Sequence, residues 1–359
     1  MLVHICCSVD SHYFLQKLQE CYPQERLIGF FYDPNIHPYS EYTLRLLDVK
    51  RSCRMLGVEL IEGEYDTQRW LEAVRGLEQE PEKGARCSVC FDRRFEVTAQ
   101  KAHALGEATF TSTLLTSPKK SLQQLQKAGE RLATTYGVRF VAPDFRKASG
   151  TQEQNLLAKH DALYRQDYCG CLFGLRMQRD QQQRLTDELF SPLTQQILPE
   201  SIESRLALYE KRTDYESQGR AYKIVKQRFL NWRLTSGLLR VRKVVVPAHF
   251  LPYATLRGEY SRGKIEYQTG ELYHMNRDEV KFITLSTYNQ QMQTAYPTIE
   301  ALLLSPPTFE EEVALLGRLG LSTYSLSTLL VVATIPEGKI ELLCQSHTYE
   351  DVKEVLVDL

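Results

Sequence analysis

The sequence predicts an α/β domain with a mostly parallel sheet flanked by helices, followed by a C-terminal α+β extension. Over roughly the first 185 residues, short apolar runs alternate with segments of helical periodicity, which is the pattern of βαβ units. After Gly174 the chain becomes polar and rich in glutamine. At 359 residues it is long enough for two hydrophobic cores. We therefore expect one domain over residues 1–185 and a second over residues 200–359, joined by a linker at about 185–200.

The expected strands and helices of the first domain follow one another along the chain. Strands are expected at the start of the run Val3–Asp10 and at Leu27–Tyr32, Val58–Glu62, Ala108–Thr113 and Val138–Val141. Helical periodicity covers Ser11–Cys21, Ser40–Leu56, Phe91–Leu105 and Ser121–Tyr136, and the alternation continues through Trp70–Leu77. Ser11 is the expected cap of the first helix. The fully apolar run Leu27–Tyr32 is typical of a strand buried on both faces of a parallel sheet.

The extension contains a basic stretch, Arg220–Lys243, with eight Lys or Arg residues and no Asp or Glu. Tyr222, Phe229 and Trp232 are interleaved with these cations. Cations bind phosphates and aromatic rings stack on bases, so one interpretation is a surface that binds nucleic acid. The other is a solvated amphipathic helix followed by a basic strand. Further strands are expected at Val244–Val246, Lys281–Leu285 and Leu329–Thr334.

Composition favours a globular protein of a reducing compartment. The chain is 43% hydrophobic and 25% charged, and it shows neither a secretory leader pattern nor a membrane-length apolar run. We therefore expect a cytoplasmic protein with no membrane partner. Its nine cysteines then favour metal binding or redox chemistry over a framework of structural disulfides. The isolated cysteines, expected to be packing residues, are Cys21, Cys53 and Cys344.

Six cysteines form three pairs in the first domain. These pairs are Cys6-Cys7, Cys87-x-x-Cys90 and Cys169-Gly-Cys171. Four thiolates from two pairs could complete a tetrahedral zinc site or a [4Fe-4S] cluster. Adjacent cysteines at the end of a strand are unusual for a zinc ribbon. The alternative is that Cys6 and Cys7 are core residues and that the second pair lies at the surface.

The third pair and Asp10 each allow two interpretations. Cys169 and Cys171 could close a short, easily reduced disulfide, because the intervening glycine tolerates unusual backbone angles. They could instead supply metal ligands. Asp10 could bind a hard or borderline metal through oxygen, or it could cap the helix that follows.

Four segments in the same order resemble the epoxyqueuosine reductases of the QueH type. These segments are His4–Asp10, Gly29–Pro38, Arg86–Phe91 and Tyr164–Cys171. The resemblance implies a HUP-type α/β fold, similar to the nucleotide-binding domains of PP-loop enzymes. It also implies the last step of queuosine biosynthesis, in which the epoxide of epoxyqueuosine at the wobble position of a transfer RNA is reduced. The extension lies outside the resemblance and is a candidate tRNA-binding addition.

The resemblance also implies roles for individual residues. The implied ligands of a [4Fe-4S] cluster are Cys6, Cys7, Cys87 and Cys90. Asp10, where many members have a third cysteine, would lie beside the cluster as a catalytic group and as the candidate ligand of an additional mononuclear iron. Cys169 and Cys171 would form a redox-active disulfide. The sequence has no G-x-G-x-x-G fingerprint and no flavin or cobalamin signature, so the expected partners are tRNA carrying epoxyqueuosine and an external electron donor.

Two other functions compete with this interpretation. A PP-loop-like sulfur transferase would use ATP, but Cys6–Ser11 stands where the Ser-Gly-Gly-x-Asp-Ser loop of those enzymes would follow the first strand. A zinc-stabilised RNA-binding module would bind metal without catalysis. Iron with acid-labile sulfide would exclude the zinc module, and independence from ATP would exclude the transferase.

Overall fold

The computed structural model describes residues 1–117, 121–147, 149–190, 192 and 194–359, and it divides the chain into two compact units. Unit 1 comprises Met1–Leu189, Arg205–Ile224 and Leu356–Leu359. Unit 2 comprises Phe190–Ser204 and Val225–Val355. The chain therefore passes between the units more than once. Of the expected linker, residues 191 and 193 lie outside the described residues.

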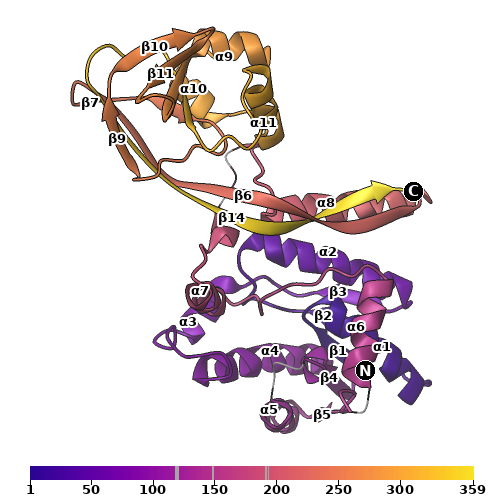
Figure 1. Cartoon of the computed structure of the whole chain (residues 1–359). Helices are drawn as coiled ribbons and strands as arrows, with labels where there is room; N and C mark the ends of the chain where they lie inside the picture. The colour runs from indigo at the N-terminus through magenta and orange to yellow at the C-terminus, as the bar shows by residue number, and fades with distance from the viewer. Residues whose placement is uncertain (118–120, 148, 191, 193) are drawn as a thin grey trace. The chain divides into compact units, whose positions relative to one another are not determined.

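A five-stranded parallel sheet forms the middle of unit 1 (Figure 1). Across the sheet, the order is β3 (Glu59–Glu62), β2 (Ile28–Phe31), β1 (Leu2–Ile5), β4 (Thr109–Ser112) and β5 (Arg139–Phe140). Every neighbouring pair is parallel. β1 and β2 are buried along their whole length, as their apolar runs predict. β4 is also fully buried, although three of its four residues are Thr or Ser. The predicted α/β fold class is confirmed.

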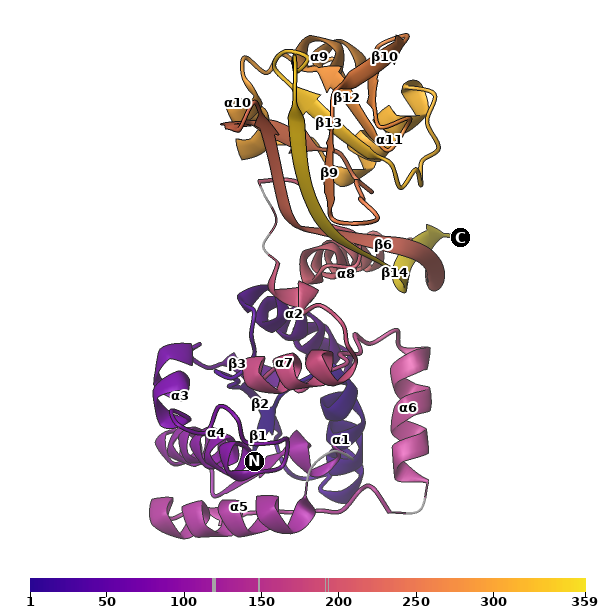
Figure 2. The same ribbon diagram turned by 60° about the vertical axis from the view of Figure 1, so that its left-hand side comes forward.

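Helices cover both faces of this sheet (Figure 2). On one face the helices that pack together are α1 (Ser8–Cys21), α2 (Tyr39–Met55) and α6 (Gly150–His160). On the other face they are α4 (Ala85–Ala104) and α5 (Leu122–Tyr136). Three further helices are α3 (Thr67–Ala73), α7 (Leu172–Gln181) and α8 (Ile202–Ser217). Ser121 caps α5, since its side chain accepts a hydrogen bond from the backbone N–H of Gln124.

Two predicted helix starts are wrong, and both errors affect the cysteines. α1 begins at Ser8, so Ser11 is not a cap; its hydroxyl donates to the Ser8 carbonyl oxygen at 3.3 Å. α4 begins at Ala85 instead of Phe91, which places Cys87 and Cys90 inside the helix. The residues before Ser11 in α1 and before Phe91 in α4 lack the apolar spacing by which a helix is identified from sequence. The same lack of apolar periodicity explains why α6 and α7 were not predicted.

The order of the strands creates a switch point beside β1. β2 and β3 lie on one side of β1, while β4 and β5 lie on the other. At such a point the connections leave the sheet in opposite directions and open a crevice beyond the carboxyl ends of the strands. Cys6 and Cys7 follow β1, and Thr113 follows β4. The first cysteine pair therefore lies where ligands bind in this class of fold.

The remaining strands form two sheets. One has the order β10 (Ile265–Thr269), β11 (Leu272–Met275), β12 (Val280–Thr284), β13 (Thr328–Val332) and β8 (Ala248–Phe250). The other has the order β7 (Val244–Val246), β6 (Tyr222–Val241), β14 (Ile340–Asp358) and β9 (Tyr260–Gly263). Unit 2 also contains α9 (Leu285–Met292), α10 (Ile299–Leu304) and α11 (Phe309–Arg318). The predicted α+β extension is confirmed.

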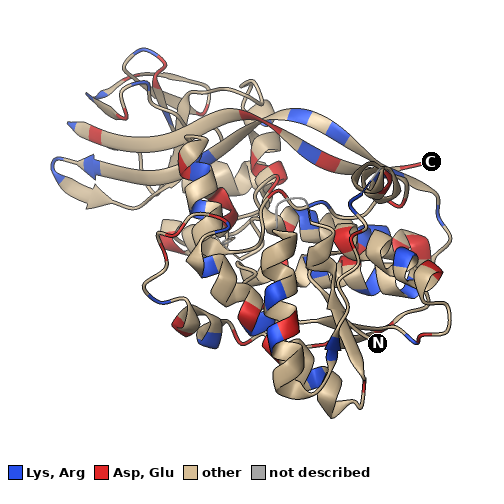
Figure 3. Cartoon of the chain, turned by 90° about the horizontal axis from the view of Figure 1, so that it is seen from below, with Lys and Arg blue, Asp and Glu red and all other residues tan. Residues whose placement is uncertain are grey.

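The basic stretch forms one long strand, β6, and not a helix followed by a strand. Figure 3 shows charges of both signs along the long strands β6 and β14. Trp232 is buried in the core of unit 2, where its indole N–H donates to the Ala254 carbonyl oxygen at 2.9 Å, so it is not available to stack on a base. None of the described helices has the length and apolar character needed to cross a membrane. The cytoplasmic location stays a prediction.

Candidate active site

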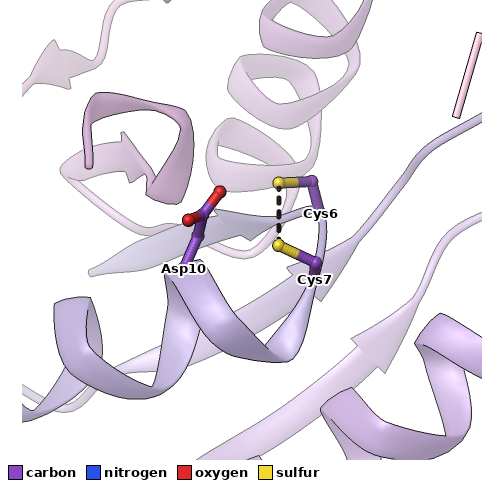
Figure 4. Close-up of side chains that lie close together, drawn as sticks. All are labelled: Cys6, Cys7 and Asp10. Atoms are coloured by element: carbon purple, nitrogen blue, oxygen red, sulfur yellow. Dashed lines mark hydrogen bonds between the residues drawn. The ribbon is translucent and has the colours of Figure 1, made fainter. Parts of the chain in front are cut away.

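The end of β1 brings two thiols and a carboxylate together (Figure 4). The Sγ atoms of Cys6 and Cys7 are 3.8 Å apart, and each lies within 4.8 Å of a carboxylate oxygen of Asp10. Cys7 is the N-cap of α1, and Asp10 follows three residues later in its first turn. Residues at this spacing share one face of a helix, which explains the convergence. Asp10 is thus not the cap of the helix.

Asp10 is held in place by a residue that sequence reasoning missed. The side-chain amide of Gln154, on α6, donates a hydrogen bond to Asp10 Oδ1 at 2.7 Å. The same nitrogen lies 3.4 Å from the Val9 carbonyl oxygen. Gln154 is buried despite its polar side chain. No motif marked this residue, because its role depends on α6 packing against α1.

All three cysteine pairs meet around one cavity of about 290 Å³. The cysteines that line it are Cys6, Cys87, Cys90, Cys169 and Cys171, and the acidic residues that line it are Asp10, Glu82 and Asp167. Cys7 is buried and belongs to the group through its contact with Cys6. The isolated cysteines do not line this cavity, and Cys53 and Cys344 are buried in hydrophobic cores, as expected for packing residues. Cys21 is exposed, contrary to that expectation.

Each cysteine pair lies at the N-terminus of a helix. Cys7 is the N-cap of α1, and Cys171 is the N-cap of α7. Cys87 and Cys90 lie in the first two turns of α4. Unpaired backbone N–H groups and the helix dipole favour negative charge at these positions. Three helix termini therefore direct partial positive charge toward one cavity, which opposes the effect of burial on the thiols there.

The loop that carries the third pair is held by α2 and the segment after β2. Arg45 donates to the carbonyl oxygens of Tyr168 and Cys169 at 3.0 and 3.2 Å, and the backbone N–H of His37 donates to the Gly170 carbonyl oxygen at 2.8 Å. Gly170 has φ of +100°, and a Cβ atom there would lie 2.8 Å from Ile36 Cγ1. A glycine is therefore required between the two cysteines.

Burial keeps several of these thiols protonated. The hydrogen bond with Cys6, burial and the charge of Asp10 raise the pKa of Cys7 well above its usual value. The hydrogen bond with Cys169, together with burial, raises the pKa of Cys171. Burial also raises the pKa of Cys90, although Arg94 and the indole of Trp70 act in the opposite direction. A bound cation would reverse this balance, because metal coordination deprotonates a thiol.

Three buried arginines lie around the cavity, and Arg45, Arg86 and Arg94 all contribute to its lining. Arg94 forms an ion pair with buried Asp33, and its charge favours the thiolate of Cys90. Arg86 donates to the Glu78 carbonyl oxygen at 2.8 Å through Nη1. Neither Arg45 nor Trp70 was identified as a functional residue from the sequence. Only the folded structure reveals their roles, because they contact cysteine segments that are remote along the chain.

A parallel α/β sheet with six converging thiols at its switch point defines a cysteine-dependent metal or redox enzyme. The family described as "Epoxyqueuosine reductase QueH" matches residues 1–177. Epoxyqueuosine reductase QueH of Helicobacter pylori is 40% identical over 332 residues, which cover 88% of this chain and 89% of that protein. The chain belongs to the epoxyqueuosine reductase QueH family and is an oxidoreductase.

Other relatives show how the family relates to the two halves of the chain. Epoxyqueuosine reductase QueH of Thermotoga maritima is 36% identical over 183 residues, which cover 50% of this chain and 92% of that protein. The relative from Histophilus somni is 37% identical over 177 residues, covering 49% of this chain and 72% of that protein. A segment about half as long as this chain thus matches nearly the whole Thermotoga protein, whereas the Helicobacter protein also matches much of the extension.

The matches to solved structures are weaker than the matches to the sequences of relatives. The U34-tRNA thiolase NcsA from Methanococcus maripaludis with its [4Fe-4S] cluster matches with a TM-score of 0.33 and 17% identity, over 60% of this chain and 73% of that chain. A predicted subunit of tRNA methyltransferase from Methanocaldococcus jannaschii also has a TM-score of 0.33, with 14% identity over 53% of this chain and 92% of that chain. Similarity at this level supports no functional argument.

Proposed function

We propose that this chain reduces the epoxide of epoxyqueuosine at the wobble position of transfer RNA by means of a [4Fe-4S] cluster. The product is queuosine, and this reduction is the last step of queuosine biosynthesis. It consumes two electrons and two protons and releases the epoxide oxygen as water. Membership of the family supports the substrate and the reaction. The observation that supports the cofactor is the convergence of the cysteine pairs on one cavity.

The residues present fit such a cluster. Its proposed ligands are Cys6, Cys7, Cys87 and Cys90. They are soft sulfur donors, they come from the starts of two helices, and buried arginines supply positive charge beside them. When bound, the cluster would supply single electrons, and an additional mononuclear iron beside Asp10 would polarise the epoxide oxygen.

The chain's own groups would position the substrate and supply protons. Asp10 lies next to the thiols, and Gln154 fixes the orientation of its carboxylate, so Asp10 is suited to hold an iron or to deliver a proton to the leaving oxygen. Cys169 and Cys171 could release two electrons and two protons as an S–S bond forms between them. An external electron donor would then return two electrons, with two protons from solvent, and restore both thiols.

The first test is the metal content of protein purified without oxygen. We expect about four irons and four acid-labile sulfides per chain, with an EPR signal after reduction by dithionite. Iron in excess of sulfide would support the additional site near Asp10. Stoichiometric zinc without sulfide would contradict the proposal and favour the zinc-stabilised RNA-binding module.

Replacement of the third pair should separate cluster binding from turnover. We expect Cys169→Ser and Cys171→Ser to retain iron and sulfide but to lose most multiple-turnover activity, because neither variant can form the S–S bond. Reduction with excess dithionite, which can supply both electrons through the cluster without the dithiol, should be less affected. Cys21→Ser is the matched control, since Cys21 is exposed and does not line the cavity. Normal multiple turnover in both variants of the pair would remove its redox role.

We further propose that exposed basic side chains of the extension bind transfer RNA. Lys223, Lys226, Arg228 and Arg240 on β6 are exposed. Two cations of the same stretch have structural roles instead: Arg220 forms an ion pair with Asp358, and buried Arg233 donates to the Pro199 carbonyl oxygen. The charge of the exposed side chains supports contact with phosphates.

The double variant Lys226→Gln/Arg228→Gln tests this surface. Each lost phosphate contact should reduce the slope of log affinity against log salt by about 0.7 to 0.9, so we expect weaker binding and a slope smaller by about 1.5. Lys264→Gln/Arg277→Gln, which neutralises two exposed cations elsewhere in unit 2, is the control. Equal affinity of both double variants for transfer RNA would show that the basic side chains of β6 are exposed to solvent and do not bind RNA.

A further inference from the structure

Trp70 forms the part of the cavity wall that lies between two cysteine pairs. The side chain comes from α3 and is only 1% exposed. It packs in one cluster with Val74, Cys90 and Cys171. Its ring also stacks on Phe173, with centroids 6.1 Å apart and an interplanar angle of 29°. Trp70 thus touches both the proposed cluster site and the redox pair.

The indole N–H of Trp70 has no partner of normal hydrogen-bond geometry among the described residues. A buried indole N–H usually finds an acceptor, and leaving one unpaired is unfavourable. Trp232, the second tryptophan of the chain, shows the usual arrangement, with its N–H donated to a carbonyl oxygen. Trp70 packs in one cluster with Cys90, and its indole lowers the pKa of that thiol against the effect of burial, so the Cys90 sulfur is the candidate acceptor.

A second unpaired donor lies on the same wall. Arg86 is also buried, and its Nε–H has no partner among the described residues. Its Nη1 is fixed by backbone carbonyl oxygens, including that of Glu80 at 2.5 Å, and its guanidinium lies 5.7 Å from the centroid of the Phe173 ring. Trp70 and Arg86 therefore flank Phe173 and face a cavity rich in sulfur. Thiolates accept hydrogen bonds far better than thiols do, so two rigid unpaired donors here indicate anionic sulfur.

We propose that the indole N–H of Trp70 donates a hydrogen bond to the Cys90 sulfur when Cys90 is a cluster ligand, and so sets the reduction potential of the cluster. The inference rests on the cluster proposed above. A hydrogen bond to a ligand sulfur stabilises the reduced, more negative form and raises the potential. Because Trp70 acts through Cys90, it is a positioning residue and not a catalytic one.

The variant Trp70→Phe tests this assignment because it keeps an aromatic ring and removes only the N–H donor and part of the indole. We expect full iron and sulfide content, and a more negative midpoint potential in an EPR-monitored titration. A hydrogen bond of ordinary strength to a charged group corresponds to about a tenfold change in the equilibrium constant for reduction. Trp232→Phe, which removes an indole that donates to a carbonyl oxygen, should leave the potential unchanged.

A second measurement needs no variant of the cluster site. In protein labelled with ¹⁵N, reduction of the cluster to its paramagnetic form should shift or broaden the indole N–H resonance of Trp70, while the Trp232 resonance reports on the fold of unit 2. If Trp70→Phe keeps its cluster at an unchanged potential, the inference is overturned and the proposed function stands. Trp70→Phe could lose the cluster, so that its potential cannot be measured. In that case, a Trp70 indole N–H resonance that is unchanged by cluster reduction in the wild type would overturn the inference. Absence of a cluster from the wild type would overturn the proposed function itself.

Discussion

Cys90→Ala should abolish the binding of iron and acid-labile sulfide, and reductase activity should disappear with them. Cys90 is 8% exposed, lies in the second turn of α4 and lines the cavity. Changes in residues that merely support metal ligands already cost about 10- to 100-fold in affinity or activity, so loss of a ligand should cost more than that. The measurements are iron and sulfide content and the rate of epoxyqueuosine reduction in transfer RNA.

Cys53→Ala is the matched control for this prediction. Cys53 is 1% exposed, but it belongs to the hydrophobic core and does not line the cavity. Burial alone raises the pKa of Cys53 to about 12, so it is an inert thiol at neutral pH. We expect this variant to retain its cluster. Full iron and sulfide in Cys90→Ala would refute the assignment of Cys90 as a ligand.

Arg45→Met should destabilise unit 1 and reduce turnover at the same time. Arg45 is 2% exposed and donates through Nε to Glu41, which is fully buried, at 2.7 Å. Removing one partner of a buried ion pair leaves an uncompensated charge and typically costs about 3–5 kcal/mol. The variant also loses the two hydrogen bonds to the carbonyl oxygens before Gly170, which position the Cys169–Cys171 loop. Urea unfolding and multiple-turnover kinetics would measure the two effects.

The double variant Arg45→Met/Glu41→Gln separates charge burial from loop positioning. It removes the uncompensated carboxylate while keeping an acceptor for the Tyr164 hydroxyl, which donates to Glu41 at 2.8 Å. We therefore expect much of the lost stability to return and turnover to stay low. Recovery of full turnover in the double variant would show that Arg45 does not position the redox pair.

The central strands β1 and β2 could be predicted because they are buried on both faces of the sheet. A strand in that environment is mostly apolar, and such a run is visible without any knowledge of its neighbours. The helices were harder to predict. α6 has few apolar residues, and it packs against α1 through contacts such as that of Gln154 with the Asp10 segment, so its amphipathic pattern is weak.

The cysteine pairs could be identified as a candidate site from their spacing, but the residues that support them could not. Gln154 and Asp10 are 144 positions apart in the chain, and Arg45 and Cys169 are 124 positions apart. Side chains that act across such separations leave no local pattern. The start of α4 shows the same limit, because a helix that begins with Ala-Arg-Cys-Ser has no apolar face toward the sheet until Cys90 and Phe91.

The sequence by itself determined the alternation of strand and helix, the three cysteine pairs and the separate character of the extension, because each of these is written in residues that are close together in the chain. Only the tertiary structure decided that the three pairs share one cavity, that each lies at a helix N-terminus, and that Trp70 and Arg45 contact the segments that carry them. The physical reason is the switch point beside β1. The order of the parallel strands brings distant helix termini to one edge of the sheet, and strand order depends on packing of the whole domain.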